Sequence, residues 1–210
     1  MVRSPDGVSY AVGYADGAIR IWSIKTNSFS TVFNGHKGAV TAVVFDSQGA
    51  RLASGSKDTE VIVWDVITEA GLFRLRGHKD VITDLKFVET GDQLITSSKD
   101  SLVKLWDLQT QHCVETLVGH RSEVWSLDVS PDESLLITGS ADKEVRLWTI
   151  NKDRLGKQLL QEATTADGEV VQTRSPFPCL IGLLSNCFLF SGKIVIKGYF
   201  TAWTLRKAGI

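Results

Sequence analysis

The sequence predicts an all-β fold, a partial β-propeller of about three and a half four-stranded antiparallel blades followed by an irregular tail. Tryptophans, Gly-His pairs and aspartates predict it, because all three recur with one period of 42 residues. A repeat of about 40 to 45 residues with Gly-His and Trp-Asp marks is typical of a propeller blade. The recurring residues are Trp22, Trp64, Trp106 and Trp148, then His36, His78 and His120, then Asp16, Asp58, Asp100 and Asp142.

Each period contains four short segments that are rich in β-branched and apolar residues. In the second copy they are AVTAVVFD, RLASGSKD, EVIVWDV and GLFRLRG, and turn-forming residues separate them. This alternation predicts four antiparallel strands, and therefore one blade per period. In the last copy GKQLLQEA is only a weak candidate for the outer strand. The predicted repeat region spans 1–150, with a partial blade over 1–34 and blades over about 35–77, 78–119 and 120–150.

Three segments that begin with Gly-His resemble WD40 repeats along their whole length. They are GHKGAVTAVVFDSQGARLASGSKDTEVIVWD, GHKDVITDLKFVETGDQLITSSKDSLVKLWD and GHRSEVWSLDVSPDESLLITGSADKEVRLWT. The resemblance implies that a His, a Ser or Thr, an Asp and a Trp are joined by hydrogen bonds inside each blade. The matching positions are His36, Ser54, Asp58 and Trp64, then His78, Thr96, Asp100 and Trp106, then His120, Thr138, Asp142 and Trp148.

A Ser, a His and an Asp also make up a hydrolase triad, but the three copies at a fixed period favour architecture over catalysis. A buried imidazole needs a partner for each ring nitrogen, and an Asp and a hydroxyl supply them while the indole N–H is also paired. No GxSxG, HExxH, GxxxxGKS or GxGxxG motif occurs. We therefore expect no catalytic residues, no metal, no cofactor, no small-molecule substrate and no enzymatic activity.

The first copy departs from the pattern. Asp16 and Trp22 are in place, but Val12 occupies the hydroxyl position and no Gly-His pair precedes it. We expect this blade to be incomplete. Fewer than four full blades would leave unpaired strand edges, so we interpret the sequence as a fragment of a longer propeller protein or as an incomplete gene model.

Residues 151–210 form a tail in which the repeat marks stop. Position 190 is Phe190, and Trp203 follows Trp148 by 55 residues rather than 42. The tail is interpreted as a domain, a linker or non-native sequence such as a translated intron. Its apolar run over 177–190 is shorter than the roughly 20 residues of a spanning helix, so no membrane partner is expected.

A net charge of -1 gives the chain no general attraction to nucleic acid, so such a partner would need a local basic patch. Basic residues follow each Gly-His pair and precede two of the turn aspartates. If they point outward at one rim, they form an arc suited to a phosphate backbone or an acidic peptide. The alternative is that they are solvated charges paired with Asp80 or Glu123. These basic residues are Lys37, Lys57, Lys79, Lys99 and Arg121.

The phrases SGSKDTEVIVWDVI, RGHKD and DLQTQHC are more particular than a general WD40 repeat. They resemble the first propeller of a eukaryotic family, WD repeat-containing protein three. That resemblance implies a non-catalytic scaffold for protein–protein assembly in the small-subunit processome, which processes pre-rRNA in the nucleolus for 40S ribosome biogenesis. It also implies partners among the proteins of a large ribonucleoprotein, with weak or indirect contact to U3 small nucleolar RNA (snoRNA) or pre-rRNA. The alternative is a general WD40 adaptor of a ubiquitin ligase or chromatin complex.

Overall fold

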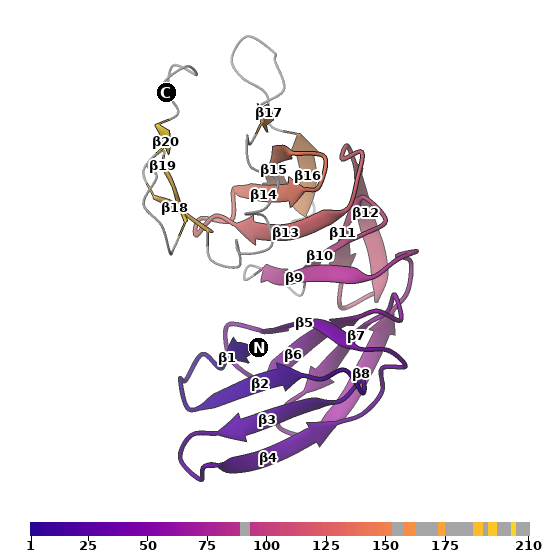
Figure 1. The fold of residues 1–210 in the computed structure, drawn as a ribbon, viewed down its shortest axis with the longest axis vertical. Coiled ribbons are helices and arrows are strands. Elements are labelled where there is room, and N and C mark those ends of the chain that lie inside the picture. Colours follow the sequence, from indigo (N-terminus) through magenta and orange to yellow (C-terminus); the bar gives the residue numbers. More distant parts are fainter. Residues whose placement is uncertain are drawn as a thin grey trace. The chain divides into compact units, whose positions relative to one another are not determined.

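The computed structural model describes residues 1–88 and 93–152, with side chains through residue 150, and five further strands between 158 and 204. Every regular element in these ranges is a strand (Figure 1). The chain forms two compact units, Met1–Val124 and Trp125–Ile210. No helix in the described ranges has the length and apolar character needed to cross a membrane.

The first unit contains three four-stranded antiparallel blades that follow one another along the chain. The innermost strand of the first blade has only two residues, whereas that of the second blade has six. The strands are β1 (Val2–Arg3), β2 (Ser9–Gly13), β3 (Ile19–Ser23) and β4 (Ser28–Phe33); β5 (Val40–Phe45), β6 (Arg51–Ser56), β7 (Val61–Asp65) and β8 (Ala70–Leu75); and β9 (Ile82–Val88), β10 (Gln93–Ser98), β11 (Leu102–Asp107) and β12 (His112–Val118).

The fourth blade contains β13 (Val124–Val129), β14 (Leu135–Ser140), β15 (Glu144–Lys152) and β16 (Gln158–Glu162) in that order. The weakly predicted outer strand in GKQLLQEA is β16, which pairs with β15 from Trp148↔Glu162 to Lys152↔Gln158. A short strand, β17 (Gln172–Arg174), pairs with the start of β15. The blade therefore continues past residue 150, because backbone pairing does not require the residues that mark the repeat.

The tail contributes one more small sheet. It is three-stranded and antiparallel, with the order β18 (Cys187–Phe190), β19 (Lys193–Ile196) and β20 (Trp203–Thr204). The prediction of an all-β, partial WD40 propeller is confirmed by the four successive antiparallel blades.

The core of the first unit lies between blades, because alternate residues of each strand point to opposite faces of the sheet. Between the first and second blades, one cluster contains Ala11, Ile19, Ile21 and Phe33 together with Phe45, Leu52, Ile62 and Trp64. Between the second and third blades, the corresponding cluster contains Ala53, Val61, Val63 and Leu75 together with Ile82, Leu85, Phe87, Leu94, Trp106 and Leu108. Each of these tryptophans thus packs against the preceding blade.

The hairpin turns also repeat, and each places one residue in the left-handed backbone region. Between the second and third strands of the four blades these residues are Gly17, Thr59, Ser101 and Lys143, with φ of 84°, 70°, 68° and 70°. Three of the four are not glycine. Gly17 is required for a further reason, because a Cβ atom there would lie 2.6 Å from the carbonyl oxygen of His36.

We predict that Gly17→Ala destabilises the chain more than Gly49→Ala does. Both glycines have positive φ, so both substitutions incur the backbone cost of about 1–2 kcal/mol. At Gly49 a Cβ atom meets only the Pro5 side chain, at 3.3 Å, whereas at Gly17 it meets a carbonyl oxygen at 2.6 Å. The closer contact adds about 1–3 kcal/mol. Urea unfolding of both variants measures the difference, and equal losses would contradict the steric argument.

Candidate functional site

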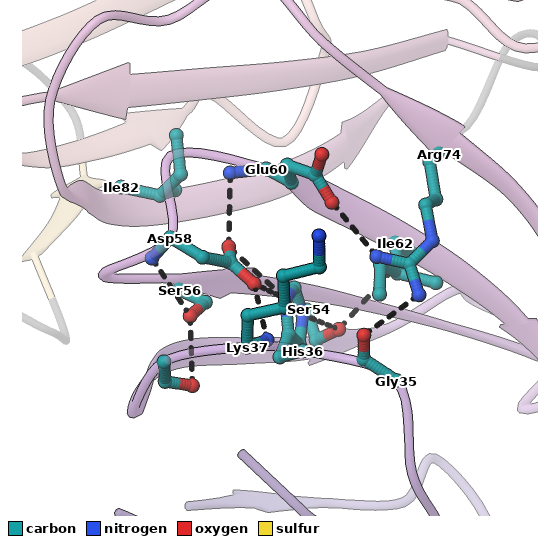
Figure 2. Close-up of polar contacts among 12 residues, drawn as sticks. Gly35, His36, Lys37, Ser54, Ser56, Asp58, Glu60, Ile62, Arg74 and Ile82 are labelled. Carbon is teal, nitrogen blue, oxygen red and sulfur yellow. Dashed lines mark hydrogen bonds and ion pairs between the residues drawn. The ribbon is translucent and has the colours of Figure 1, made fainter.

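The predicted polar set of the second blade comes together in the structure. His36 lies in the loop before β5, Ser54 on β6, Asp58 in the β6–β7 turn and Trp64 on β7. The indole Nε1 of Trp64 lies 2.8 Å from Ser54 Oγ, and His36 Nε2 lies 2.8 Å from the same oxygen. His36 Nδ1 lies 3.0 Å from Asp58 Oδ2. Figure 2 shows His36 between Ser54 and Asp58.

The donor and acceptor roles in this set follow from the Asp58 carboxylate, which can only accept, and from the Trp64 indole N–H, which can only donate. The Asp58 carboxylate can only accept, so His36 Nδ1 carries the ring hydrogen and Nε2 of the neutral ring accepts from the Ser54 hydroxyl, while Trp64 N–H donates to Ser54 Oγ. The imidazole hydrogen then resides on Nδ1 and is donated to the Asp58 carboxylate. In this assignment each polar group of the set has a partner of the opposite kind, with the imidazole neutral and the carboxylate ionised.

The pKa shifts of His36 and Asp58 agree with a neutral imidazole beside an ionised carboxylate. Burial lowers the pKa of His36 and outweighs the opposing attraction of Asp58. Burial alone would raise the pKa of Asp58, but hydrogen bonds from the backbone N–H groups of Lys37 and Glu60, and the contact with His36, lower it below its ordinary value. The carboxylate therefore stays charged at neutral pH while the ring does not.

Asp58 also fixes the main chain on both sides of the set. Its carboxylate accepts the backbone N–H of Lys37 at 2.7 Å and that of Glu60 at 3.0 Å. One side chain thereby holds the Gly-His loop and its own turn in place. Ser54 is fully buried, so its hydroxyl cannot reach a substrate and serves as a structural link instead of a nucleophile.

The third blade repeats this arrangement. His78 Nε2 lies 2.8 Å from Thr96 Oγ1, and Trp106 Nε1 donates to the same oxygen at 2.8 Å. His78 Nδ1 lies 2.9 Å from Asp100 Oδ2, which also accepts the backbone N–H of Lys79 at 2.9 Å. Burial opposes ionisation of Asp100, but the hydrogen bonds from His78 and Lys79 lower its pKa overall.

In the fourth blade the structure brings together two parts of the set. Trp148 Nε1 donates to Thr138 Oγ1 at 2.9 Å, and Asp142 Oδ1 accepts the backbone N–H of Glu144 at 2.9 Å. His120 belongs to the other unit, where its side chain is buried. The turn and the indole thus keep the geometry of the second and third blades.

A fifth polar residue in each of these blades was missed by the sequence analysis. Ser56, Ser98 and Ser140 are buried, and each accepts the backbone N–H of the turn aspartate two residues later, at 3.1 to 3.2 Å. Ser56 Oγ also donates to the carbonyl oxygen of Gly38 at 2.9 Å, and Ser98 Oγ to that of Asp80 at 3.0 Å. The 42-residue spacing of these serines was the signal that could have identified them.

The first blade keeps its turn by different chemistry. Asp16 accepts the backbone N–H of Ala18 at 2.9 Å, as the other turn aspartates do, but its second oxygen pairs with Arg20 Nη2 at 2.8 Å. The Arg20 guanidinium lies 4.1 Å from the ring centroid of Tyr14. With Val12 in place of a hydroxyl, the half-buried Trp22 packs edge-on against Phe29 at a centroid distance of 4.8 Å.

The predicted basic rim has a fixed backbone. The main chain at Lys37 and Lys79 is held by Asp58 and Asp100, and the N–H groups of Lys57 and Lys99 donate to carbonyl oxygens of the preceding loops at 2.9 and 3.0 Å. The side chains of Lys37, Lys57, Lys79 and Arg121 are exposed. Lys99 is half-buried, and its Nζ lies 3.4 Å from Glu123 Oε1. For Lys99, the structure therefore agrees with the alternative that the rim charge is paired with Glu123.

The described residues offer no metal site, since no group of three or more His, Cys, Asp or Glu side chains among them converges. The site is therefore a set of rigid loops at one rim of the blades. It can present charged side chains to a partner, and it has no accessible nucleophile paired with a base among the repeated sets.

We predict that Ser54→Ala destabilises the chain by about 2–4 kcal/mol, because the buried Trp64 N–H and the His36 ring nitrogen both lose their partner. Ser54→Thr is the matched control, since Thr96 and Thr138 occupy the same repeat position. It keeps the hydroxyl and should therefore cost less than Ser54→Ala does. Urea unfolding monitored by tryptophan fluorescence compares them, and equal destabilisation would show that the hydroxyl is not the important group.

We also predict that stability falls as the pH is lowered from 7 toward 5. Because the pKa of His36 is lower in the folded chain than its ordinary value of 6.5, the unfolded chain binds the proton first in this window. The stabilisation is fully present above about pH 6.5 and is lost as the pH falls toward the folded-state pKa. Urea unfolding at several pH values measures the slope, and NMR titration of the His36 ring should give a midpoint below 6.5. A midpoint above 6.5 would refute the assignment.

The comparisons with known proteins agree with this geometry. A family model described as the WDR3 first beta-propeller domain matches residues 1–150. The solved structure titled "Structure of U3-55K" has a TM-score of 0.66 and 28% sequence identity, and the match covers 76% of this chain and 50% of that chain.

Two curated relatives match over shorter stretches. U3 small nucleolar RNA-associated protein 12 of Saccharomyces cerevisiae is 50% identical over 42 residues, which cover 20% of this chain and 4% of the yeast protein. The WD repeat-containing protein 3 homolog of Dictyostelium discoideum is 56% identical over 37 residues, which cover 18% of this chain and 4% of that protein. These alignments span only a small part of either relative. Because the family model matches more than half of the sequence, the chain belongs to the WDR3 first β-propeller family.

Proposed function

We propose that the chain is a non-catalytic scaffold for protein–protein assembly in the small-subunit processome, acting in pre-rRNA processing for the 40S subunit. The observation that carries this proposal is the repeated polar set. In the second blade the Ser, His and Asp side chains hydrogen-bond to one another inside the fold. The Thr, His and Asp side chains of the third blade do the same. What remains at the surface is a set of rigid loops, and such loops suit recognition of a partner.

The family and the relatives support the choice of assembly. The chain belongs to the WDR3 family, and one relative is named as a U3 small nucleolar RNA-associated protein. We infer nucleolar localisation on the same basis. The proposed partners are other proteins of a large ribonucleoprotein.

The basic rim is the proposed contact for the ribonucleoprotein. Lys37, Lys57 and Lys79 extend from loops whose main chain is already held by hydrogen bonds, so binding a partner does not add a backbone-ordering cost at these loops. Exposed lysines at such a rim suit a phosphate backbone or an acidic peptide. The pairing of Lys99 with Glu123 reduces the positive charge at one point of the arc.

Affinity purification of the tagged chain from nuclear extract tests this function. We expect U3 snoRNA to be recovered together with processome proteins. Recovery of a ubiquitin ligase or chromatin complex without that RNA would instead support a general WD40 adaptor and overturn the proposed assembly.

The rim is tested in the same purification with a triple variant, Lys37→Glu, Lys57→Glu and Lys79→Glu. We expect RNA recovery to fall at least tenfold, because phosphate contacts carry most of the electrostatic affinity for nucleic acid. Lys25→Glu is the control, since Lys25 is exposed in the β3–β4 turn at the other end of the strands. Unchanged recovery from the triple variant would exclude the rim as the contact.

A further inference from the structure

The Gly-His loop of the second blade differs from the other two in the residue that precedes its glycine. That residue is Asn34, whereas Arg76 and Val118 occupy the equivalent positions before the later Gly-His pairs. The Asn34 side chain is exposed, and the residue lies outside regular structure, directly after the end of β4. Asparagine is one of the chemically labile side chains, so an exposed Asn-Gly pair is a candidate for covalent change.

The two groups that would react with each other are not occupied. Within the described part of the chain, neither the Asn34 carboxamide nor the Gly35 backbone N–H has a hydrogen-bond partner. Glycine also has no side chain that could shield its nitrogen. Packing requires glycine at this place, because a Cβ atom on Gly35 would lie 2.8 Å from Cη2 of Trp64. The fold thus imposes the residue that leaves the nitrogen open to attack.

Two exposed Asp-Gly pairs, which can form the same cyclic imide, show the contrast. In Asp16-Gly17 the glycine N–H donates to the carbonyl oxygen of Tyr14 at 3.3 Å, and the carboxylate accepts the backbone N–H of Ala18 at 2.9 Å. Asp6-Gly7 is occupied in the same way, through its glycine N–H and its carboxylate. Hydrogen bonds therefore hold both partners of these pairs apart, and they do not hold Asn34-Gly35.

We propose that Asn34-Gly35 is a site of spontaneous deamidation, which alters the second blade as the protein ages. The Gly35 nitrogen loses its proton to solvent base and attacks Asn34 Cγ. The bond from Cγ to the side-chain nitrogen breaks, and that nitrogen takes up a proton and leaves as ammonia. Water then adds to either carbonyl carbon of the cyclic imide and breaks the bond from that carbon to the Gly35 nitrogen. The products are aspartate and isoaspartate, and the net reaction consumes water and releases ammonia.

The isoaspartate product lengthens the main chain where both sides of the pair are held. Its backbone runs through Cβ and Cγ of residue 34 and no longer directly from Cα to the carbonyl carbon. On one side, Phe33 is buried at the end of β4. On the other side, the Gly35 carbonyl oxygen accepts a hydrogen bond from Arg74 Nη2 at 2.6 Å (Figure 2). The longer chain cannot keep both contacts unchanged, so isoaspartate should destabilise the Gly-His loop.

Either product also adds a carboxylate to the loop that leads to Lys37, the first lysine of the basic rim. A new negative charge beside a basic surface weakens its attraction for an anionic partner. This second effect rests on the proposed function, whereas the deamidation itself does not. The following experiment measures the deamidation without any partner, so its outcome is independent of the rim contact.

Incubation of the purified full chain at physiological temperature, followed by tryptic digestion and liquid chromatography with mass spectrometry, tests the proposal. Trypsin releases residues 26–37 as one peptide, which contains Asn34 and, as an internal control, the exposed Asn27 before Ser28. We expect Asn34 to convert to aspartyl and isoaspartyl forms several-fold faster than Asn27. Mildly alkaline pH should accelerate the conversion, because the attacking nitrogen must lose its proton.

Asn34→Gln is the matched control, because a glutamine would have to close a larger and less favourable ring. It should abolish the fast conversion. Urea unfolding after the same incubation should show a lower midpoint for the wild type and an unchanged midpoint for Asn34→Gln. Conversion of Asn34 no faster than that of Asn27, or conversion only in the urea-unfolded chain, would overturn the proposal. An aged wild type with an unchanged midpoint would overturn the predicted effect on the loop.

Discussion

The hydrogen bond between a buried imidazole and the turn aspartate is the interaction on which the loops of the second and third blades depend. In the second blade it joins His36 to Asp58, and the same carboxylate accepts the backbone N–H of Lys37. Ser56 and the Lys57 N–H, which donates to the carbonyl oxygen of Ala39, add further ties between the Gly-His loop and the turn. The ring is neutral because burial disfavours its charged form more than the neighbouring Asp58 carboxylate favours it, which lowers the pKa of His36.

The same set couples the polar loops to the apolar core. Trp64 donates to Ser54 and also lies in the cluster between the first two blades, 5.2 Å from the ring of Phe33. A single blade has too little apolar area to bury by itself, so its tryptophan must find a neighbouring sheet. Trp22 shows the contrast, because it has no hydroxyl partner at Val12 and remains half-buried.

The sequence predicted those features that depend on local chemistry repeated at a fixed spacing. The strands of the four blades, the turns and the His, Ser or Thr, Asp and Trp members of the polar sets fall into this class, although the buried serines Ser56, Ser98 and Ser140 were missed. Contacts between different repeats could not be predicted, because they depend on which sheets become neighbours. Thr83 Oγ1, for example, donates to the carbonyl oxygen of Val124 in the next inner strand at 2.6 Å. The left-handed backbone conformation of Thr59 was also not predicted. β-branched residues disfavour that conformation, and the hairpin around Thr59 holds it there.

The hydrogen bonds from Asp58 and Asp100 that hold the Gly-His loops also determine what kind of partner the basic rim can recognise. Because the main chain of Lys37 and Lys79 is held by the carboxylates of Asp58 and Asp100, the spacing of the rim lysines is set by the blade repeat and not by the partner. Negative charge is close by, since Asp58 and Asp100 are ionised and Glu123 pairs with Lys99. A rim of alternating charge discriminates among partners by complementary pattern more than by total charge. Such a surface recognises a partner whose negative charges match the spacing of the rim lysines, whether these are the phosphates of RNA or the carboxylates of an acidic peptide.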